Sequence, residues 1–299
     1  HSLESSISRL EGDDYPEAVG VALFMAYEQA LEQINSKYPW QERIAISLLD
    51  TLSLLAASGV PTHWLLALDD DSDAVRDTLS FLKRSSILQE STDGNKTIIH
   101  RLQGQVYRES YLNNQEELDK ASTHVTTTLN GISVNQFNSF EQQRQEIRNL
   151  IEQFHSITSQ KYSHPLFSVP VFVSMLATTL RHATDLGMPQ LALTLTESVT
   201  QAGDTLGPDH SDTLTSRNNL ATAYQDAGKL DEAITLFEQT LEDSTRTMGP
   251  DHPDTLTSRN NLAVTYSEAD ELDEAIALHK QNLDSRTRIL GPHHPDTLT

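Results

Sequence analysis

The last third of the chain repeats itself at a fixed interval. The tetrapeptide GPDH at 207–210 recurs at 249–252 and, in the altered form GPHH, at 291–294. The step is 42 residues, and 26 of the 42 positions are identical between 207–248 and 249–290. A repeat of this length indicates a stack of small units, because each unit can bury its apolar face only against its neighbours.

Each repeat predicts two helices. The first runs from Asp212 to Gly228 and the second from Asp231 to Met248, both with apolar residues near a period of 3.6. Gly228 ends the first helix in a left-handed conformation, and Asp270 replaces it one repeat later, where that conformation is less favourable. In the loop between repeats, we expect Asp251 to cap the free N–H groups of the next helix.

The spacing of Leu220-Ala221, Tyr224, Ala233 and Phe237 resembles the tetratricopeptide repeat. The phrase LGPDHPDTLTSRNNLAxxY resembles the longer form of that repeat found in kinesin light chains. The second copy has His279 in place of the aromatic residue, which we expect to be partly buried, and a weaker unit precedes at 176–199. The resemblance implies an α-α superhelix over residues 170–299, with one degenerate repeat, two clear ones and the start of a further one. We expect the array to continue beyond Thr299.

A polar stripe on the first helix of each repeat is the candidate binding surface. In tetratricopeptide repeats this stripe lines the concave groove, where an Asn amide can both donate to and accept from a peptide backbone. The arginines beside it could meet a carboxylate. Two other interpretations remain open: a merely solvated face, or Asn side chains that bond the neighbouring repeat. The candidate partner-binding residues are Thr215, Arg217, Asn218, Thr222, Gln225, Thr257, Arg259, Asn260, Val264 and Ser267.

Residues 41–112 predict a different domain. Helices are expected at 41–57, 62–67 and 73–83, then strands at 86–89 and 97–100 joined by a Thr92–Asn95 hairpin turn, then a helix at 101–112. This is the element order of a winged helix. Such domains often read DNA with their third helix, but here that helix begins in the acidic run Asp69–Asp73, which would repel phosphates.

The segment from Val60 to Tyr111 resembles the winged-helix part of bacterial STAND ATPases of the NB-ARC type, in which a motor domain precedes the winged helix and repeats follow it. The resemblance makes residues 1–40 a linker helix from a missing motor, 41–112 the winged helix and 113–169 a helical connector. Ile99-His100-Arg101-Leu102 resembles the family's Met-His-Asp motif, which implies that His100 contacts the ADP phosphate in the full-length protein.

Several kinds of chemistry are missing from the sequence. It has no phosphate-binding loop of the form G-x-x-x-x-G-K-[ST] and none of the common hydrolase or metalloprotease motifs, so we expect no enzyme activity in this chain. The Asp-His pairs of the loops recur one per repeat, which does not favour a metal site. We therefore expect no cofactor in this chain, with ADP or ATP and Mg bound only by the full-length protein.

Composition limits the partners and the compartment. The chain has no cysteine, a net charge of −22 and no long apolar run, which favours the cytoplasm and argues against membranes and direct nucleic-acid binding. The expected fold is mainly α. The expected function is the regulatory and sensor half of a STAND NTPase. Its repeats would bind a protein or peptide, its winged helix would contact the motor, and the full-length protein would form an oligomer when activated. The alternatives are a plain tetratricopeptide scaffold and a DNA-binding winged-helix regulator.

Overall fold

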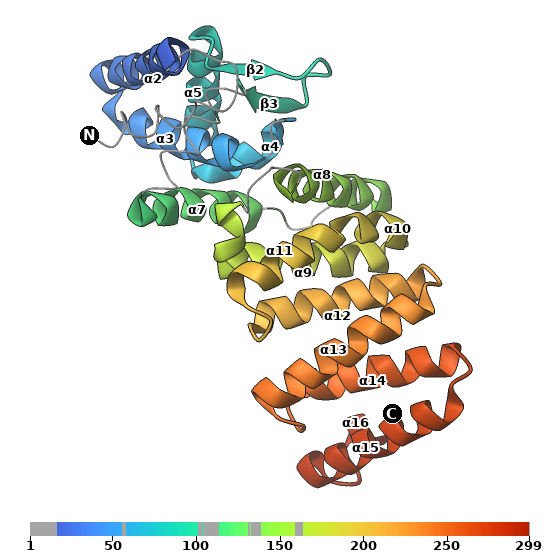
Figure 1. Ribbon diagram of the computed structural model, residues 1–299. Coiled ribbons are helices and arrows are strands. Elements are labelled where there is room, and N and C mark those ends of the chain that lie inside the picture. The colour runs from blue at the N-terminus through green and yellow to red at the C-terminus, as the bar shows by residue number, and fades with distance from the viewer. Residues whose placement is uncertain are drawn as a thin grey trace. The chain divides into compact units, whose positions relative to one another are not determined.

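The structure, a computed structural model, describes residues 17–55, 58–100, 104, 114–130, 132, 139–158 and 164–298. It is mainly helical and divides into two compact units (Figure 1). Unit 1 comprises residues 1–137 and 159–166, and unit 2 comprises residues 138–158 and 167–299. The segment predicted as one connector, 113–169, contributes to both: helix α7 (Gln115–Asn130) belongs to unit 1 and helix α8 (Phe140–Thr158) to unit 2.

Helix α3 (Pro39–Leu54) supplies the apolar centre of unit 1. It fully buries Leu48, Leu49 and Leu52, which lie on one side of the helix. Helices α2 (Glu17–Lys37), α5 (Ser72–Arg84) and α7 pack against it. One polar pair lies in this packing: Nδ1 of His124 on α7 is 2.8 Å from Oδ2 of the buried Asp50 on α3.

A small antiparallel sheet completes the described part of unit 1. Its strands β1 (Val60–Pro61), β2 (Leu88–Glu90) and β3 (Lys96–Ile99) lie in the order β1-β3-β2, with Leu88 opposite Ile99. Helix α4 (Thr62–Leu65) and a 3-10 turn (Leu66–Leu68) follow β1. The predicted hairpin turn is confirmed, with Gly94 at φ 71°. The helix predicted at 101–112 lies outside the described residues except for Gly104.

Unit 2 is built from helix pairs that stack along the chain (Figure 1). We call the first helix of each pair A and the second B. The predicted A and B helices of the two clear repeats are confirmed within two residues at each end. After α8 and the short 3-10 turn Pro165–Ser168, the A helices are α9 (Pro170–Asp185), α12 (Ser211–Asp226) and α14 (Pro253–Glu268), and the B helices are α10 (Pro189–Ala192) with α11 (Thr196–Leu206), α13 (Leu230–Met248) and α15 (Leu272–Leu290), before α16 (Pro295–Leu298).

Small residues let the helices of neighbouring repeats approach closely. Ala221, Ala233, Ala263 and Ala275 are all buried. One apolar cluster joins α12, α13, α14 and α15 around the fully buried ring of Phe237. A repeat unit therefore has its core only in contact with the next repeat, which is the expected property of a stacked array.

The first B helix is one residue shorter than the later ones. The left-handed residues Gly187 and Gly228 are 41 apart, whereas Gly228 and Asp270 are 42 apart. The shortening falls at a 3-10 turn, Leu193–Leu195, between α10 and α11. Because a 3-10 helix needs 3.0 residues per turn and an α-helix 3.6, this turn recovers part of the rotation that the missing residue would have supplied. Leu195 consequently reaches a fully buried position, as Phe237 does in α13.

The loops between repeats use different caps from those expected. His210 and His252, rather than the preceding aspartates, are the N-cap residues, and Nδ1 of each accepts a hydrogen bond of 3.2 Å from the backbone N–H two residues on. Asp209 is instead hydrogen-bonded to the guanidinium of Arg246, and Asp251 to that of Arg288. Each loop is thus fastened to the end of the following B helix, 37 residues along the chain.

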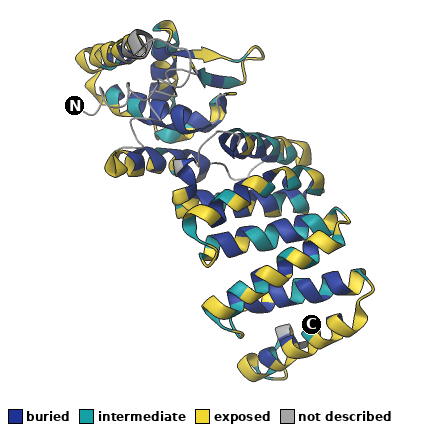
Figure 2. Ribbon diagram, in the orientation of Figure 1, coloured by how far each residue is buried: buried dark blue, intermediate teal, exposed yellow. Residues whose placement is uncertain are grey.

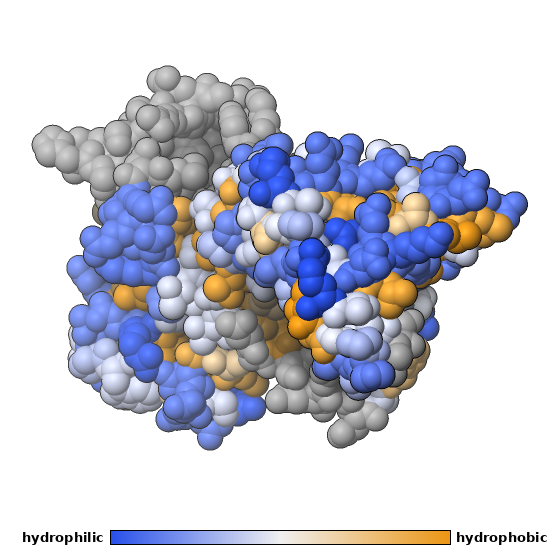
Figure 3. Space-filling view, turned by 90° about the horizontal axis from the view of Figure 1, so that it is seen from below, coloured by the Kyte–Doolittle hydropathy of each residue, from blue (hydrophilic) through white to orange (hydrophobic). Residues whose placement is uncertain are grey.

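In the described part of the chain, the outer face of α15 is covered less than that of α13, because the helix that follows α15 is the four-residue α16. Leu272, Ile276 and Leu283 are 52%, 50% and 49% exposed, whereas Leu230, Ile234 and Leu241 at the same positions of α13 are half-buried next to α14. Figure 2 shows that α15 has more exposed residues than α13. In Figure 3, which views the molecule from below, hydrophobic residues lie between hydrophilic ones on the surface. His279, expected to be partly buried, is exposed for the same reason.

Candidate functional site

The predicted polar stripe lies on the A helices, with a graded exposure. Thr215, Thr257 and Ser267 are exposed, while Asn218, Thr222, Gln225, Asn260 and Val264 are half-buried. The threonine hydroxyls are satisfied within their own helices: those of Thr215 and Thr257 donate to backbone carbonyls four residues earlier. Among the residues that the structure describes, the amide groups of Gln225 and Asn260 have no hydrogen-bond partner. These two amides can offer both a donor and an acceptor to a partner.

Two asparagines of α12 connect neighbouring helices. Oδ1 of Asn218 accepts a hydrogen bond of 3.1 Å from the Ser258 hydroxyl on α14, and Nδ2 of Asn219 donates one of 2.8 Å to the Ala177 carbonyl on α9. The interpretation of an asparagine as a brace between repeats therefore applies to these two residues. α12 packs along α9 over much of its length but meets α14 at few positions, so the braces differ on its two sides.

The two arginines do not lie beside the stripe. Arg217 extends from the opposite face of α12, as its helical position requires, and its Nη1 is 3.1 Å from Oδ2 of Asp243 on α13. Arg259 is buried, with its guanidinium donating to the Pro250 carbonyl and to Oδ1 of Asn282. Burial lowers the pKa of Arg259 from its ordinary value. Arg259 is therefore part of the packing inside its repeat, and a partner's carboxylate cannot reach it.

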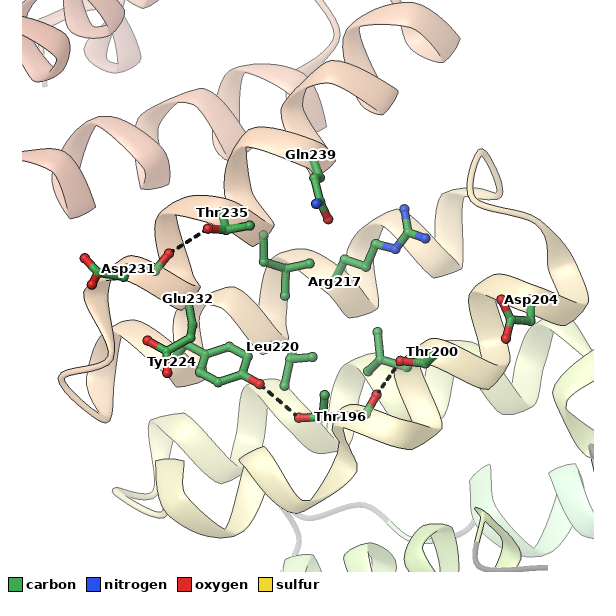
Figure 4. A pocket seen from close by; sticks show the side chains of 12 residues that line it. Thr196, Thr200, Asp204, Arg217, Leu220, Tyr224, Asp231, Glu232, Thr235 and Gln239 are labelled. Atoms are coloured by element: carbon green, nitrogen blue, oxygen red, sulfur yellow. Dashed lines mark hydrogen bonds between the residues drawn. The ribbon is translucent and has the colours of Figure 1, made fainter. Parts of the chain in front are cut away.

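A groove that the sequence did not predict lies on the B side of the array. It is enclosed by α11, α12 and α13 and has a volume of about 470 Å³ (Figure 4). Val199 and Leu220 are buried at its base, and Tyr224 and Leu236 are half-buried there. Its margins are exposed and polar, with carboxylates at Asp204, Asp231 and Glu232.

Substitutions on α11 explain why the groove is open at this position. Three positions of α11 carry smaller side chains than the positions 42 residues later on α13. They are Thr196 against Glu238, Val199 against Leu241 and Asp204 against Arg246. One repeat later, Glu238 accepts the hydroxyl hydrogen bond of Tyr266 at 2.5 Å. At the groove, the same ring position is Tyr224, whose hydroxyl lies 3.3 Å from the shorter Thr196.

Gly203 makes room for Arg217 at the groove. A Cβ atom at Gly203 would lie 3.1 Å from an Nη2 of Arg217, and one repeat later the position is Thr245. Arg217 also has Asp243 as its partner, where the later repeat has Ser285. These differences keep the Arg217 head group at the groove while the equivalent Arg259 folds inward. Aligning the degenerate unit backward from Gly207 would have revealed these differences in the sequence.

His100, predicted as a nucleotide contact, lies at the end of β3 in unit 1. Its exposed side chain borders a second cavity, of about 460 Å³, together with Lys83, Ser86 and residues of β2. Lys83 forms an ion pair with Glu90 at this cavity. Arg101 and Leu102 lie outside the described residues.

The described parts of the chain hold neither a candidate metal site nor a candidate membrane span. No group of three or more His, Cys, Asp or Glu side chains there could hold a metal ion. None of the helices described above is both long and apolar enough to span a bilayer.

Comparison with known protein families agrees with the repeat geometry. The tetratricopeptide repeat family model matches residues 176–243 and 212–284. BtubC (BKLC) from P. vanneervenii is 16% identical, with a TM-score of 0.41, over 64% of this chain and 71% of its own. A substituted form of a kinesin light chain candidate from Podosopora anserina, with nearly identical repeats, is 23% identical with a TM-score of 0.42, over 73% and 89%.

A second structure of the Podosopora anserina protein is 21% identical with a TM-score of 0.40, over 61% of this chain and 92% of its own. The search of curated protein sequences finds no match. Helix pairs at a 42-residue step, a shared core between consecutive pairs and the matching family model lead to one conclusion. Residues 176–284 of this chain are tetratricopeptide repeats.

Proposed function

We propose that this chain recognises a protein partner through its repeats, using the polar stripe of the A helices. The observation that supports this most directly is the pair of amides at Gln225 and Asn260, which have no hydrogen-bond partner among the described residues. A half-buried amide of this kind gains by pairing with a peptide N–H and C=O, because it can offer a donor and an acceptor in one plane. The stripe residues proposed for contact are now Thr215, Thr222, Gln225, Thr257, Asn260, Val264 and Ser267, with Asn218 acting as a brace.

The test compares capture of host proteins by the full chain and by stripe variants. Gln225→Ala with Asn260→Ala should lose a partner that the wild-type chain retains, while the stability measured by thermal melting stays within about 0.5 kcal/mol of wild type because the side chains are polar and half-buried. The matched control is Gln281→Ala, a polar substitution on the exposed part of α15. Equal loss of the partner with this control, or no loss with the stripe variant, would contradict the assignment.

For unit 1 we propose the winged-helix role in a bacterial STAND NTPase, with a motor domain in the full-length protein. The order α3-β1-α4-α5-β2-β3 and the β1-β3-β2 sheet support a winged helix. The position of His100 directly after β3, beside a cavity that also contains Lys83, supports the proposed ADP contact. In this proposal the cytoplasmic full-length protein binds ADP or ATP with Mg, the repeats sense the partner, and activation leads to an oligomer.

A plain scaffold is the simpler alternative, and the DNA-binding regulator has less support. At the start of α5, Asp71 caps the helix by accepting from the N–H groups of Asp73 and Ala74, so the acidic run is built into the helix terminus. The distinguishing experiment is the sequence of the complete gene followed by an ADP titration of the complete protein and its His100→Ala variant. Unchanged ADP affinity in the variant would refute the contact between His100 and the ADP phosphate. A gene without a phosphate-binding loop would favour the plain tetratricopeptide scaffold.

A further inference from the structure

The groove between α11, α12 and α13 has an apolar base and an acidic margin. Val199 and Leu220 form a buried base, and Tyr224 presents its ring beside them (Figure 4). Asp204, Asp231 and Glu232 surround this base, and within the described part of the chain none of these three carboxylates has an ion-pair partner. The positive charge of Arg217 is balanced within an ion-pair network, in which Asp243 pairs with both Arg217 and Arg246 and Asp209 pairs with Arg246.

The Tyr224 ring already faces a cation. Nζ of Lys229 lies 5.8 Å from the centre of the ring, within the range of a cation–π contact. Lys229 comes from the loop before α13 and is exposed. The position is therefore one at which an ammonium or guanidinium group from another molecule would also be stabilised, by the ring and by the carboxylates of α13.

We propose that this groove binds a basic peptide segment, with one aliphatic side chain on the Val199–Leu220 base and a flanking lysine or arginine between Tyr224, Asp231 and Glu232. Charge complementarity argues for this occupant, because the groove is acidic and the whole chain has a net charge of −22. The site is distinct from the polar stripe, since Leu220 and Tyr224 lie on the opposite face of α12 from Asn218 and Thr222. The inference rests on the proposed function, because it adds a second surface to the same partner-binding array.

The repeat itself supplies a way to close the groove without damaging the fold. Thr196→Glu with Val199→Leu installs the residues that the chain already has at Glu238 and Leu241, where the neighbouring tyrosine is covered. The charge variant is Asp231→Asn with Glu232→Gln, which keeps side-chain size. Its matched control is Asp273→Asn with Glu274→Gln, the same residues one repeat later on α15.

The probe is a short fluorescein-labelled peptide in which one leucine lies between two lysines, measured by polarisation against the full chain. Reference peptides replace the leucine by serine or the lysines by glutamates. We expect the groove-closing variant to bind the leucine-lysine peptide about tenfold more weakly, because the buried leucine contact is lost. The charge variant should bind about two- to fivefold more weakly. The α15 control should bind as wild type does, and Lys229→Ala should bind more tightly because the competing cation is gone.

Each contrary result is decisive. If the leucine-lysine peptide does not bind, the groove assignment is wrong. If binding falls equally in the charge variant and in the α15 control, the attraction is non-specific and the groove assignment is again wrong. Tighter binding of the glutamate peptide would mean that Arg217 selects an acidic ligand, which also contradicts the proposal of a basic peptide. If the peptide is weakened only by Gln225→Ala with Asn260→Ala, the groove assignment fails while recognition by the stripe stands. If the groove variants behave as expected and the stripe variants capture host proteins normally, the stripe fails while the groove stands.

Discussion

Residues that are identical in sequence have different contacts in consecutive repeats. Arg217 and Arg259 occupy the same repeat position, yet one is at a groove and the other is buried. The cause lies in their neighbours, Asp243 against Ser285 and Gly203 against Thr245. The sequence therefore predicts the position of each side chain on its helix, but its partner depends on substitutions in another helix.

The two stripe asparagines provide a direct test of this difference. Asn218→Ala should lower the free energy of unfolding by about 1 kcal/mol, because the Ser258 hydroxyl loses its acceptor across the repeat interface. Asn260→Ala should change it by no more than about 0.5 kcal/mol, since that amide has no partner among the described residues. Urea denaturation of the two variants measures both values. Equal losses would show that the brace at Asn218 contributes nothing of its own.

Two aspartates of one repeat should give opposite pH dependences. Partial burial, together with the charges of Glu268 and Asp185, raises the pKa of Asp226 above its ordinary 3.8, so its ionised form opposes folding at neutral pH. The hydrogen bond from Arg246 lowers the pKa of Asp209 from the same ordinary value, so its ionised form favours folding and that contribution is lost as the pH falls through the lowered pKa.

At pH 7 we therefore expect Asp226→Asn to melt at a higher temperature than wild type and Asp209→Asn at a lower one. Both differences should shrink toward zero as the pH falls through the aspartate range, because the wild-type carboxyl groups then become neutral too. Thermal melting at pH 7 and in acid measures the effect. A shift of the same sign in both variants would contradict the assignment of the two environments.

At the scale of the helices, the apolar period predicted most of the fold. Leucines that recur at helical spacing on α3 (Leu48, Leu49 and Leu52) are buried, and so are Ile147, Leu150 and Phe154 at the same spacing on α8. The period could not predict the interruption at Leu193–Leu195, because only the distance between Gly187 and Gly228 reveals the missing residue. It also could not identify His252 as the helix cap, since Asp251 is as good a cap by type and is taken up by Arg288.

The turn between A and B helices should respond to glycine. Asp270 has φ 65° in the position where Gly228 has φ 74°. Asp270→Gly should raise the free energy of unfolding by about 0.5–1 kcal/mol, because relief of the left-handed strain exceeds the entropic cost of glycine. The reciprocal Gly228→Asp should lower it by a similar amount. Chemical denaturation checks both, and a stabilising Gly228→Asp would refute the strain.

The B helices offer a second comparison at equivalent positions. Phe237→Ala should cost about 3–5 kcal/mol, because the ring is fully buried between α12, α13 and α14. His279→Ala should change stability by no more than about 0.5 kcal/mol, since His279 is exposed on α15. Melting curves of both variants provide the measurement. A large effect at His279 would mean that the outer face of α15 is covered in solution.

At the scale of the whole molecule, the 42-residue repeat predicted the helices of unit 2 far better than short local patterns predicted the elements of unit 1. A 42-residue step fixes the number of helices and their spacing, whereas the short strands β1 and β2 carry only two and three residues of pattern. The groove was missed because it arises between a degenerate repeat and a regular one. Its residues are scattered over three helices, and none of them stands out within its own helix.

The chain on its own should not bind nucleotide tightly. It lacks a phosphate-binding loop, and His100 with Lys83 supplies at most two contacts in a strongly acidic protein. Calorimetry with ADP and Mg should show no binding tighter than about millimolar. The matched measurement on His100→Ala should be indistinguishable from wild type. Micromolar affinity in this chain would mean that unit 1 holds a nucleotide without a motor domain.

The exposed face of α15 sets how much free energy a local opening of this helix costs. An interior pair such as α12 and α13 loses contacts on two sides when it opens. Helix α15 has α14 on one side, but on the other it has only the four-residue helix α16 and the exposed side chains of Leu272, Ile276 and Leu283. Local opening of α15 therefore exposes less additional apolar surface than opening of α12 and α13 and costs less free energy. In this chain the backbone amides of α15 should exchange their hydrogens before those of α12 and α13, and a further repeat packed on this face would remove the difference.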